Sequence, residues 1–217
     1  NGMPMGIQAL FGIGVLDFSL ASGFYAMMYT YLVLMAAIHA AMLGAVILSK
    51  EERDKTTEFL YVKPASRATI LTAKLLAALT QVLVFALVNW IAAAGFVAAY
   101  GETAGAEIAE LIAGMLLVQL VFLSLGIAAA AVFKRPKAAT GVATGAMLTA
   151  YFLSIAIDLN GDLDWMTFLT PFAYFDAKDV VGAGKGLSVP YTLLCVGLVA
   201  ALTALSYLRF ERRDLQV

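Results

Sequence analysis

Cysteine and histidine are almost absent from this chain of 217 residues, which has one of each, Cys195 and His39. A lone cysteine cannot form an intrachain disulfide, and metal sites usually show clusters of Cys and His at short spacings. We therefore expect no disulfide framework and no metal site. Cys195 lies in an apolar run, which predicts a buried thiol.

Charge is also scarce. Charged residues make up 13% of the chain and hydrophobic residues 62%, with a mean hydropathy of +0.89, whereas soluble domains carry roughly 25% charged residues. A soluble all-helical protein with this composition would need polar outer faces on its helices, and most of the apolar segments have none. The net charge of −1 gives no basic signal for nucleic acid. The composition predicts a membrane protein.

Catalytic motifs are missing as well. The stretch Gly182-Ala-Gly-Lys-Gly186 is faintly similar to a phosphate-binding loop, whose pattern is G-x-x-x-x-G-K-[ST]. Here Asp179 stands where the first glycine should be, and Gly186 replaces the Ser/Thr. We predict that the chain is not an enzyme by itself, and we keep an intramembrane enzyme as a minor alternative.

Five apolar stretches are long enough to cross a membrane, since a span needs about 20 mostly apolar residues. Each must be helical, because a lone strand would leave its backbone groups unpaired in lipid. The predicted fold is an all-α transmembrane helical bundle that forms a single domain over residues 1–217. Its spans are expected at residues 24–48, 70–100, 108–133, 138–157 and 189–208.

Basic residues gather in alternate connections. Of the 14 Lys and Arg residues, 12 lie in residues 49–69, at Lys74, in 134–137 and in 209–217. Only Lys178 and Lys185 lie in the other set, which comprises residues 1–23, 101–107 and 158–188. The positive-inside rule places the first set, with the C-terminus, in the cytoplasm. We expect a multi-pass protein of the cell inner membrane.

This orientation puts Asn1 outside the cell. Residues 1–23 lack the basic region that opens a signal peptide, and we interpret them as an extracytoplasmic loop. Because an exported N-terminal segment needs something to carry it across, we expect a sixth span upstream of Asn1.

The longest external segment, residues 158–188, is rich in aromatic residues around Pro171 and holds more acids than its two lysines. Aromatic side chains favour the headgroup level. We expect either a short interfacial or re-entrant helix broken at Pro171 or an ordinary solvated loop.

The longest cytoplasmic connection, residues 50–69, is dense in charge of both signs and turns apolar before Pro64. Pro64 disfavours helix at the residue before it, and Ser66 offers an N-cap for the next helix. The pattern predicts a short amphipathic helix, a break, and a new helix with Arg67 and Lys74 about two turns apart. A solvated loop whose charges only set the topology is the alternative.

This segment resembles the loop after the second span of ABC-2 type permeases, which typically reads E-E-x-x-G-T-x-E-x-L-L-x-x-P-x-S-R-x-x-I-x-x-x-K. Lys55 and Tyr61 depart from that pattern. The segment Tyr207–Leu215 is similar to the exit of the family's last span, and the resemblance covers essentially the whole chain. The residues that match are Glu51, Glu52, Thr56, Glu58, Leu60, Pro64, Ser66, Arg67, Ile70 and Lys74.

The resemblance implies the membrane-spanning half of an ABC exporter. Such permeases dimerise and bind two cytoplasmic ATPase subunits, which hold ATP and Mg²⁺, so this chain itself would bind no cofactor. Contact with the ATPase would fall to Glu51, Glu52, Thr56 and Glu58. Pro64, which breaks the helix, would complete the coupling region together with Arg67 and Lys74, which would anchor the following helix.

Four polar residues lie inside predicted spans, where such groups are costly and often functional. Either they line a translocation path or they make ordinary interhelical hydrogen bonds. None is strongly charged, which favours an amphiphilic or apolar cargo over an ion. They are His39, Gln81, Asn89 and Gln119.

Gly141 and Gly145 form a G-x-x-x-G pattern that permits close helix packing. A different class of function also stays open, namely a membrane sensor or assembly scaffold without transport activity. Its binding surface would be the loop at residues 158–188.

Overall fold

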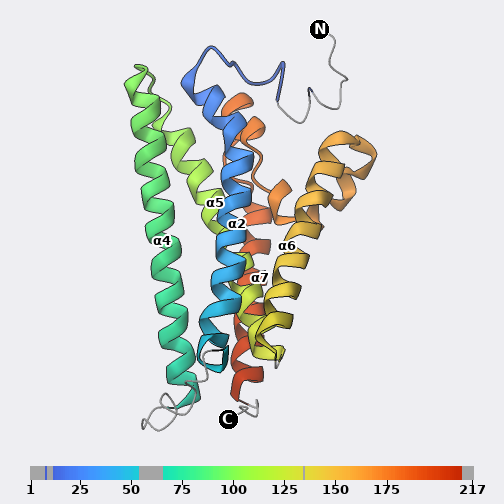
Figure 1. Cartoon of the computed structure of the whole chain (residues 1–217). Helices are drawn as coiled ribbons and strands as arrows, with labels where there is room; N and C mark the ends of the chain where they lie inside the picture. The colour runs from blue at the N-terminus through green and yellow to red at the C-terminus, as the bar shows by residue number, and fades with distance from the viewer. Residues whose placement is uncertain (1–7, 9–11, 54–65, 134, 212–217) are drawn as a thin grey trace.

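The computed structural model describes residues 8, 12–53, 66–133 and 135–211. Within these ranges the chain folds into five long helices, each apolar and long enough to cross a membrane (Figure 1). They confirm the predicted all-α bundle and its five spans. The helices are α2 (Ala21–Arg53), α4 (Arg67–Ala99), α5 (Gly105–Val132), α6 (Pro136–Leu159) and α7 (Val189–Glu211).

Most of these helices extend beyond the apolar runs that predicted them. Helix α2 has 33 residues and continues through Lys50 to Arg53. At 1.5 Å per residue it is about 50 Å long, which exceeds the ~30 Å hydrocarbon core. Apolar runs mark only the part of a helix that lies in lipid, so the charged last turn of α2 was not part of the predicted span.

The bundle has two ends of different character (Figure 1). Helices α2, α5 and α7 finish at one end, where α4 and α6 begin. We call this the basic end, because 12 of the 14 Lys and Arg residues of the sequence lie in its connections or close to them. The other end, which we call the loop end, carries the start of α2, the α4–α5 connection and the segment between α6 and α7.

Helix α5 is the centre of the bundle and contacts each of the other four long helices. It runs in the same direction as α2: Tyr29 donates a hydrogen bond to the Leu111 carbonyl at 2.7 Å, and Gly44 lies further along beside Leu123 and Gly126. A Cβ atom on Gly44 would lie 2.3 Å from the Leu123 carbonyl oxygen, and one on Gly126 would lie 2.4 Å from the Ala41 carbonyl oxygen. The two backbones are therefore in direct contact, as small residues allow in membrane helices.

The predicted packing glycines of α6 have a different environment. A Cβ atom on Gly141 or on Gly145 would meet nothing within 4 Å among the described residues. The close approach thus belongs to Gly44 and Gly126, which lie on different helices and form no local pattern.

Short helices build the loop end between α6 and α7. Two 3₁₀ helices, η1 (Gly161–Leu169) and η2 (Pro171–Ala173), are separated by Thr170, and a π-helical turn, η3 (Lys178–Gly182), follows. Thr170 is fully buried, and its hydroxyl donates to the Ala150 carbonyl in α6 at 2.7 Å. Residues 12–16 lie against η3, since a Cβ atom on Gly182 would be 2.7 Å from Val15 Cγ1. The segment from 158 to 188 is folded onto the bundle.

The start of α2 is fixed by a carboxylate from the α4–α5 connection. The Ala21 and Ser22 amides donate to Oε1 and Oε2 of Glu102 at 2.5 and 3.1 Å. Hydrogen bonds from Ser22 and Ala21 to the charged form lower the pKa of Glu102. A remote side chain thus takes the N-cap role, which a local residue usually fills.

Candidate functional site

The basic end holds part of the predicted coupling region. Helix α4 begins at Arg67, and Ser66 caps it by accepting a hydrogen bond from the Thr69 amide at 3.1 Å. The cap fixes where α4 begins. The helix then packs against α2 and α7.

Lys74 joins α4 to α2. Its ammonium donates to the carbonyls of Ile47 and Leu48 at 2.8 and 3.4 Å. These carbonyls lie shortly before the end of α2 at Arg53. A lysine in the membrane-facing part of a helix normally extends its charge toward the interface. Here the ammonium instead donates to carbonyls of the neighbouring helix.

Arg67 and Thr72 join α4 to α7. The Arg67 guanidinium donates to the carbonyl of Glu211, the last residue of α7, at 3.1 Å. The hydroxyls of Thr72 and Tyr207 are hydrogen-bonded at 2.7 Å. We call the three α4 residues Arg67, Thr72 and Lys74, with their partners on α2 and α7, the basic-end clasp.

Thr72 and Tyr207 were not predicted as site residues. Each looks ordinary in the sequence, because a threonine inside a membrane helix usually bonds to its own backbone. Thr72 does so too, to the Ala68 carbonyl at 2.8 Å. Only the packing of α7 beside α4 brings the second hydroxyl within reach.

The other predicted coupling residues lie around the end of α2. Glu51 and Glu52 belong to its last turn. Thr56, Glu58 and Pro64 lie outside the described residues. The coupling segment therefore leaves α2 within about two turns of the carbonyls that Lys74 binds.

Two of the four predicted path residues meet at Phe85 of α4. The His39 ring stacks on the Phe85 ring, with centroids 5.3 Å apart and planes 12° from parallel. The Asn89 side chain donates to the Phe85 carbonyl at 2.9 Å, within its own helix. The His39 Nδ1 atom is buried and has no hydrogen-bond partner among the described residues.

The other two path residues lie elsewhere. Gln81 is exposed on the outside of α4. Gln119 has no exposed surface, and neither its amide oxygen nor its amide nitrogen has a hydrogen-bond partner in the described part of the chain. An unpaired buried amide destabilises a fold by about 1–3 kcal/mol. Of the four, Gln119 is the side chain with the largest unmet hydrogen-bonding capacity.

Among residues 8, 12–53, 66–133 and 135–211, no three His, Cys, Asp or Glu side chains form a group that could hold a metal ion.

These observations define a class: a polytopic α-helical membrane protein whose helices are joined by polar contacts at its basic end. A comparison with protein families places it more narrowly, because the sequence profile described as ABC-2 family transporter protein matches residues 6–215. The chain belongs to that family. It is a permease, the membrane-spanning transport subunit of an ABC transporter system that works with ATPase partners, as the loop at residues 50–74 predicted. No curated protein matches the chain at a significant level.

Proposed function

We propose that this permease forms the translocation path of an ATP-driven exporter and is coupled to separate ATPase subunits through its basic end. The observation that carries the proposal is the basic-end clasp. It connects the two helices that flank the coupling segment, α2 and α4, to each other and to α7.

The proposed orientation puts the basic end, with the C-terminus, in the cytoplasm of a cell with the protein in its inner membrane. The support is the asymmetry of basic residues, which follows the positive-inside rule. The coupling segment is then on the side where ATP is available. Its proposed ATPase contacts are Glu51, Glu52, Thr56 and Glu58.

The basic-end clasp provides a route by which a displacement of the coupling segment reaches α4 and α7. When the ATPase subunits close on ATP, they displace the segment that begins at the end of α2. Because Lys74 holds α4 to the carbonyls of Ile47 and Leu48, α2 and α4 move together at this end, and Arg67 passes the displacement to α7. ATP can shift the permease only if the closed ATPase prefers one arrangement of the helices, which is a linkage between two sites.

The partners in this proposal are two ATPase subunits, a second permease copy and the surrounding lipid. ATP and Mg²⁺ bind to the ATPase. The path is proposed to pass His39, Asn89 and Gln119, with Gln119 acquiring hydrogen-bond partners in a second arrangement of the helices. Gln81 is exposed on α4, a position suited to a contact with the second copy or with lipid.

The proposal is tested by purifying the tagged full-length protein in detergent from its native host and identifying what accompanies it by mass spectrometry. A stoichiometric P-loop ATPase should accompany the wild-type protein and be lost from the double variant Glu52→Arg/Glu58→Arg. The matched control is Asp179→Asn/Lys185→Met, which changes as many charged residues at the loop end and should retain the ATPase. If the Glu52→Arg/Glu58→Arg variant recovers as much ATPase as the wild type, the proposed contact of Glu52 and Glu58 with the ATPase is wrong.

A sensor or scaffold that binds through residues 158–188 is the second candidate. The observation that favours it is the folded state of this segment against the bundle. It predicts that the protein keeps its function in a strain that lacks the ATPase, whereas an exporter loses it.

A further inference from the structure

The loop end contains a cavity of about 470 Å³ between α2, α6 and the start of α7. In Figure 1, α6 leans away from α2 at this end. The cavity reaches Val33 on α2, which lies about 18 Å along the helix from Ala21. Its volume falls in the range of about 300–1,000 Å³ that is usual for small-molecule sites.

Aromatic side chains form much of the wall. Tyr174 and Tyr191 are stacked with centroids 4.7 Å apart and planes within 2° of parallel, and Tyr151 meets Phe172 edge-on at 5.4 Å. All four line the cavity, and so does Tyr29 from α2. The hydroxyl of Tyr174 donates to the Phe168 carbonyl at 2.5 Å, which fixes that ring in place. Aromatic ring faces attract cations, and the half-buried rings of Tyr151, Phe172 and Tyr191 line the cavity.

The charge of the lining is negative. Four carboxylates line the cavity, on Asp158, Asp164, Asp176 and Asp179, against two ammonium groups on Lys178 and Lys185, a formal charge of −2. Low-dielectric walls concentrate the field of such a set. A cation is favoured over an anion.

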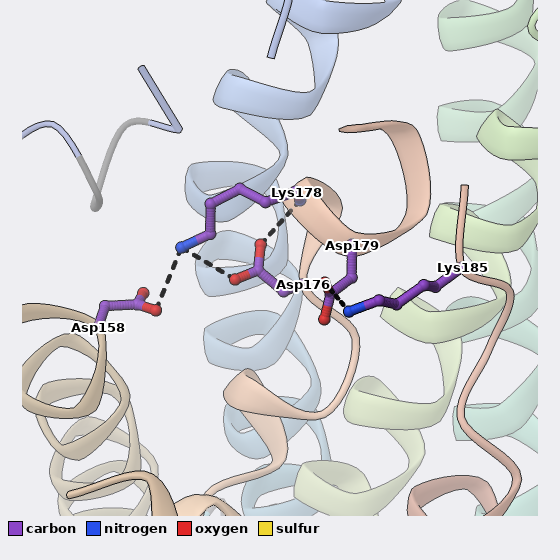
Figure 2. A network of polar contacts seen from close by, with 5 residues as sticks. All are labelled: Asp158, Asp176, Lys178, Asp179 and Lys185. Carbon is purple, nitrogen blue, oxygen red and sulfur yellow. Dashed lines mark hydrogen bonds and ion pairs between the residues drawn. The ribbon is translucent and has the colours of Figure 1, made fainter. Parts of the chain in front are cut away.

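Two ion-pair systems share these charges, and Figure 2 shows them side by side. Lys178 lies between Asp158 at 3.2 Å and Asp176 at 3.0 Å, with only 22% of its side chain exposed. Lys185 pairs with Asp179 at 3.0 Å, and their side chains are 69% and 58% exposed. Burial alone would lower the pKa of Lys178, but the carboxylates of Asp176 and Asp158 outweigh it and raise that pKa.

The Lys178 ammonium thus occupies a small cation site made by two carboxylates from separate elements. Asp158 is near the end of α6, and Asp176 lies just before η3, where its Oδ1 also accepts the Lys178 amide at 2.9 Å. The Lys178 ammonium is attached through a flexible side chain. Another cation can therefore take its place while the hydrogen bond from the Lys178 amide to Asp176 remains.

We propose that this cavity binds a hydrophobic organic cation, whose charged group replaces the Lys178 ammonium between Asp158 and Asp176 and whose apolar part lies against Tyr174, Tyr191 and Phe172. The site goes beyond the coupling proposal, because equilibrium binding needs no ATPase. Divalent metal ions fit less well, since they prefer a shell of six or more oxygens and aromatic rings form part of the wall here.

The test is equilibrium binding of 2-phenylethylammonium to the full chain in detergent without ATPase, with 3-phenylpropionate as a probe of similar size and opposite charge. Wild-type protein should bind the cation and not the anion. Asp158→Asn/Asp176→Asn should weaken cation binding by about tenfold, because a buried cation loses its counter-charges. Lys178→Met should strengthen it by a similar factor, because it removes the competing ammonium.

The control is Asp179→Asn/Lys185→Met, which neutralises the exposed pair and should leave the affinity within a factor of about two. If Lys178→Met does not fold, Lys178→Arg takes its place and should weaken cation binding, because the guanidinium holds both carboxylates more firmly. Equal cation binding by wild type and Asp158→Asn/Asp176→Asn would overturn the proposal, as would tighter binding of 3-phenylpropionate.

Failure of this site is separable from failure of the coupling proposal. If cation binding is absent while the ATPase still copurifies, only the cation site is wrong. If the cation binds as expected and no ATPase copurifies, only the coupling assignment is wrong.

Discussion

The two ends of the bundle are built on different principles. At the basic end, α4 is hydrogen-bonded to α2 and α7 by side chains that reach backbone carbonyls and one hydroxyl. At the loop end, α6 stands away from α2 around a cavity, and Lys178 bridges α6 to the segment before η3 by ion pairs. In the coupling proposal, force therefore enters at the basic end, and the helices rearrange at the loop end.

Between the two ends lies the contact of α2 with α5. Gly44 and Gly126 bring the backbones together there, and Ala36, Ala37 and Ala40 are fully buried on α2. A close contact of small residues leaves little room for sliding but lets two helices tilt about the crossing. In the coupling proposal, this α2–α5 contact serves as the pivot between the two ends.

The largest effect is expected from filling the pivot. Gly126→Leu would add a leucine side chain at a position where even a Cβ atom would lie 2.4 Å from the Ala41 carbonyl oxygen. We expect destabilisation beyond the ~1–3 kcal/mol usual for overpacking, seen as a large drop in thermal stability of the detergent-purified chain. Gly145→Leu is the control, because a Cβ atom there meets nothing within 4 Å. Equal stability of the two variants would contradict the close backbone contact between α2 and α5.

Breaking the clasp should uncouple the ends without unfolding the protein. Lys74→Met keeps the length of the side chain and removes the bonds to Ile47 and Leu48. We expect substrate stimulation of the ATPase to fall about fivefold or more, the lower range of usual coupling energies. Lys137→Met, an exposed residue at the same end, should leave stimulation unchanged. A normal response in Lys74→Met would show that α2 and α4 need no such link.

The unpaired amide of Gln119 offers a test that separates packing from transport. Because neither amide atom has a partner in the described chain, Gln119→Leu should be neutral or stabilising by about 1 kcal/mol. Transport should still fall if the side chain lines the path. Thr170→Val, which removes the bond to the Ala150 carbonyl, should instead lower thermal stability. Loss of stability in Gln119→Leu would mean that the amide is satisfied in the folded protein.

The smallest effect concerns pH and the start of α2. The pKa of Glu102 is lowered in the folded chain, so its stabilising contribution is present above the ordinary carboxyl pKa and disappears as pH falls through the lowered value. Hydrogen exchange at the Ala21 and Ser22 amides should accelerate there, relative to intrinsic rates. Glu102→Gln should abolish that pH dependence, whereas Glu110→Gln should retain it. If protection of these amides from exchange does not depend on pH in the wild type, the capping role of Glu102 is wrong.

The sequence was sufficient for the spans, because each apolar run stands alone and hydrocarbon length fixes its minimum extent. A local pattern shared with the family also selected Arg67 and Lys74, whose coupling role stays a prediction. The sequence did not identify Thr72 and Tyr207, or Gly44 and Gly126, because these pairs are far apart in the chain and meet only through helix packing. Lys178 resembled any loop lysine until α6 placed Asp158 beside it.

Two distances in the assembled transporter, measured by electron spin resonance, would show whether the two ends respond differently to ATP. The buried Cys195 is changed to Ser, and each complex carries one labelled protomer. One pair of labels, at Phe24 and Leu159, reports on α2 and α6 at the loop end; the other, at Leu76 and Leu208, reports on α4 and α7 near the basic end. We expect ATP with orthovanadate to change the Phe24–Leu159 distance and to leave the Leu76–Leu208 distance the same. A loop end that ignores ATP, or a basic end whose helices separate, would contradict it.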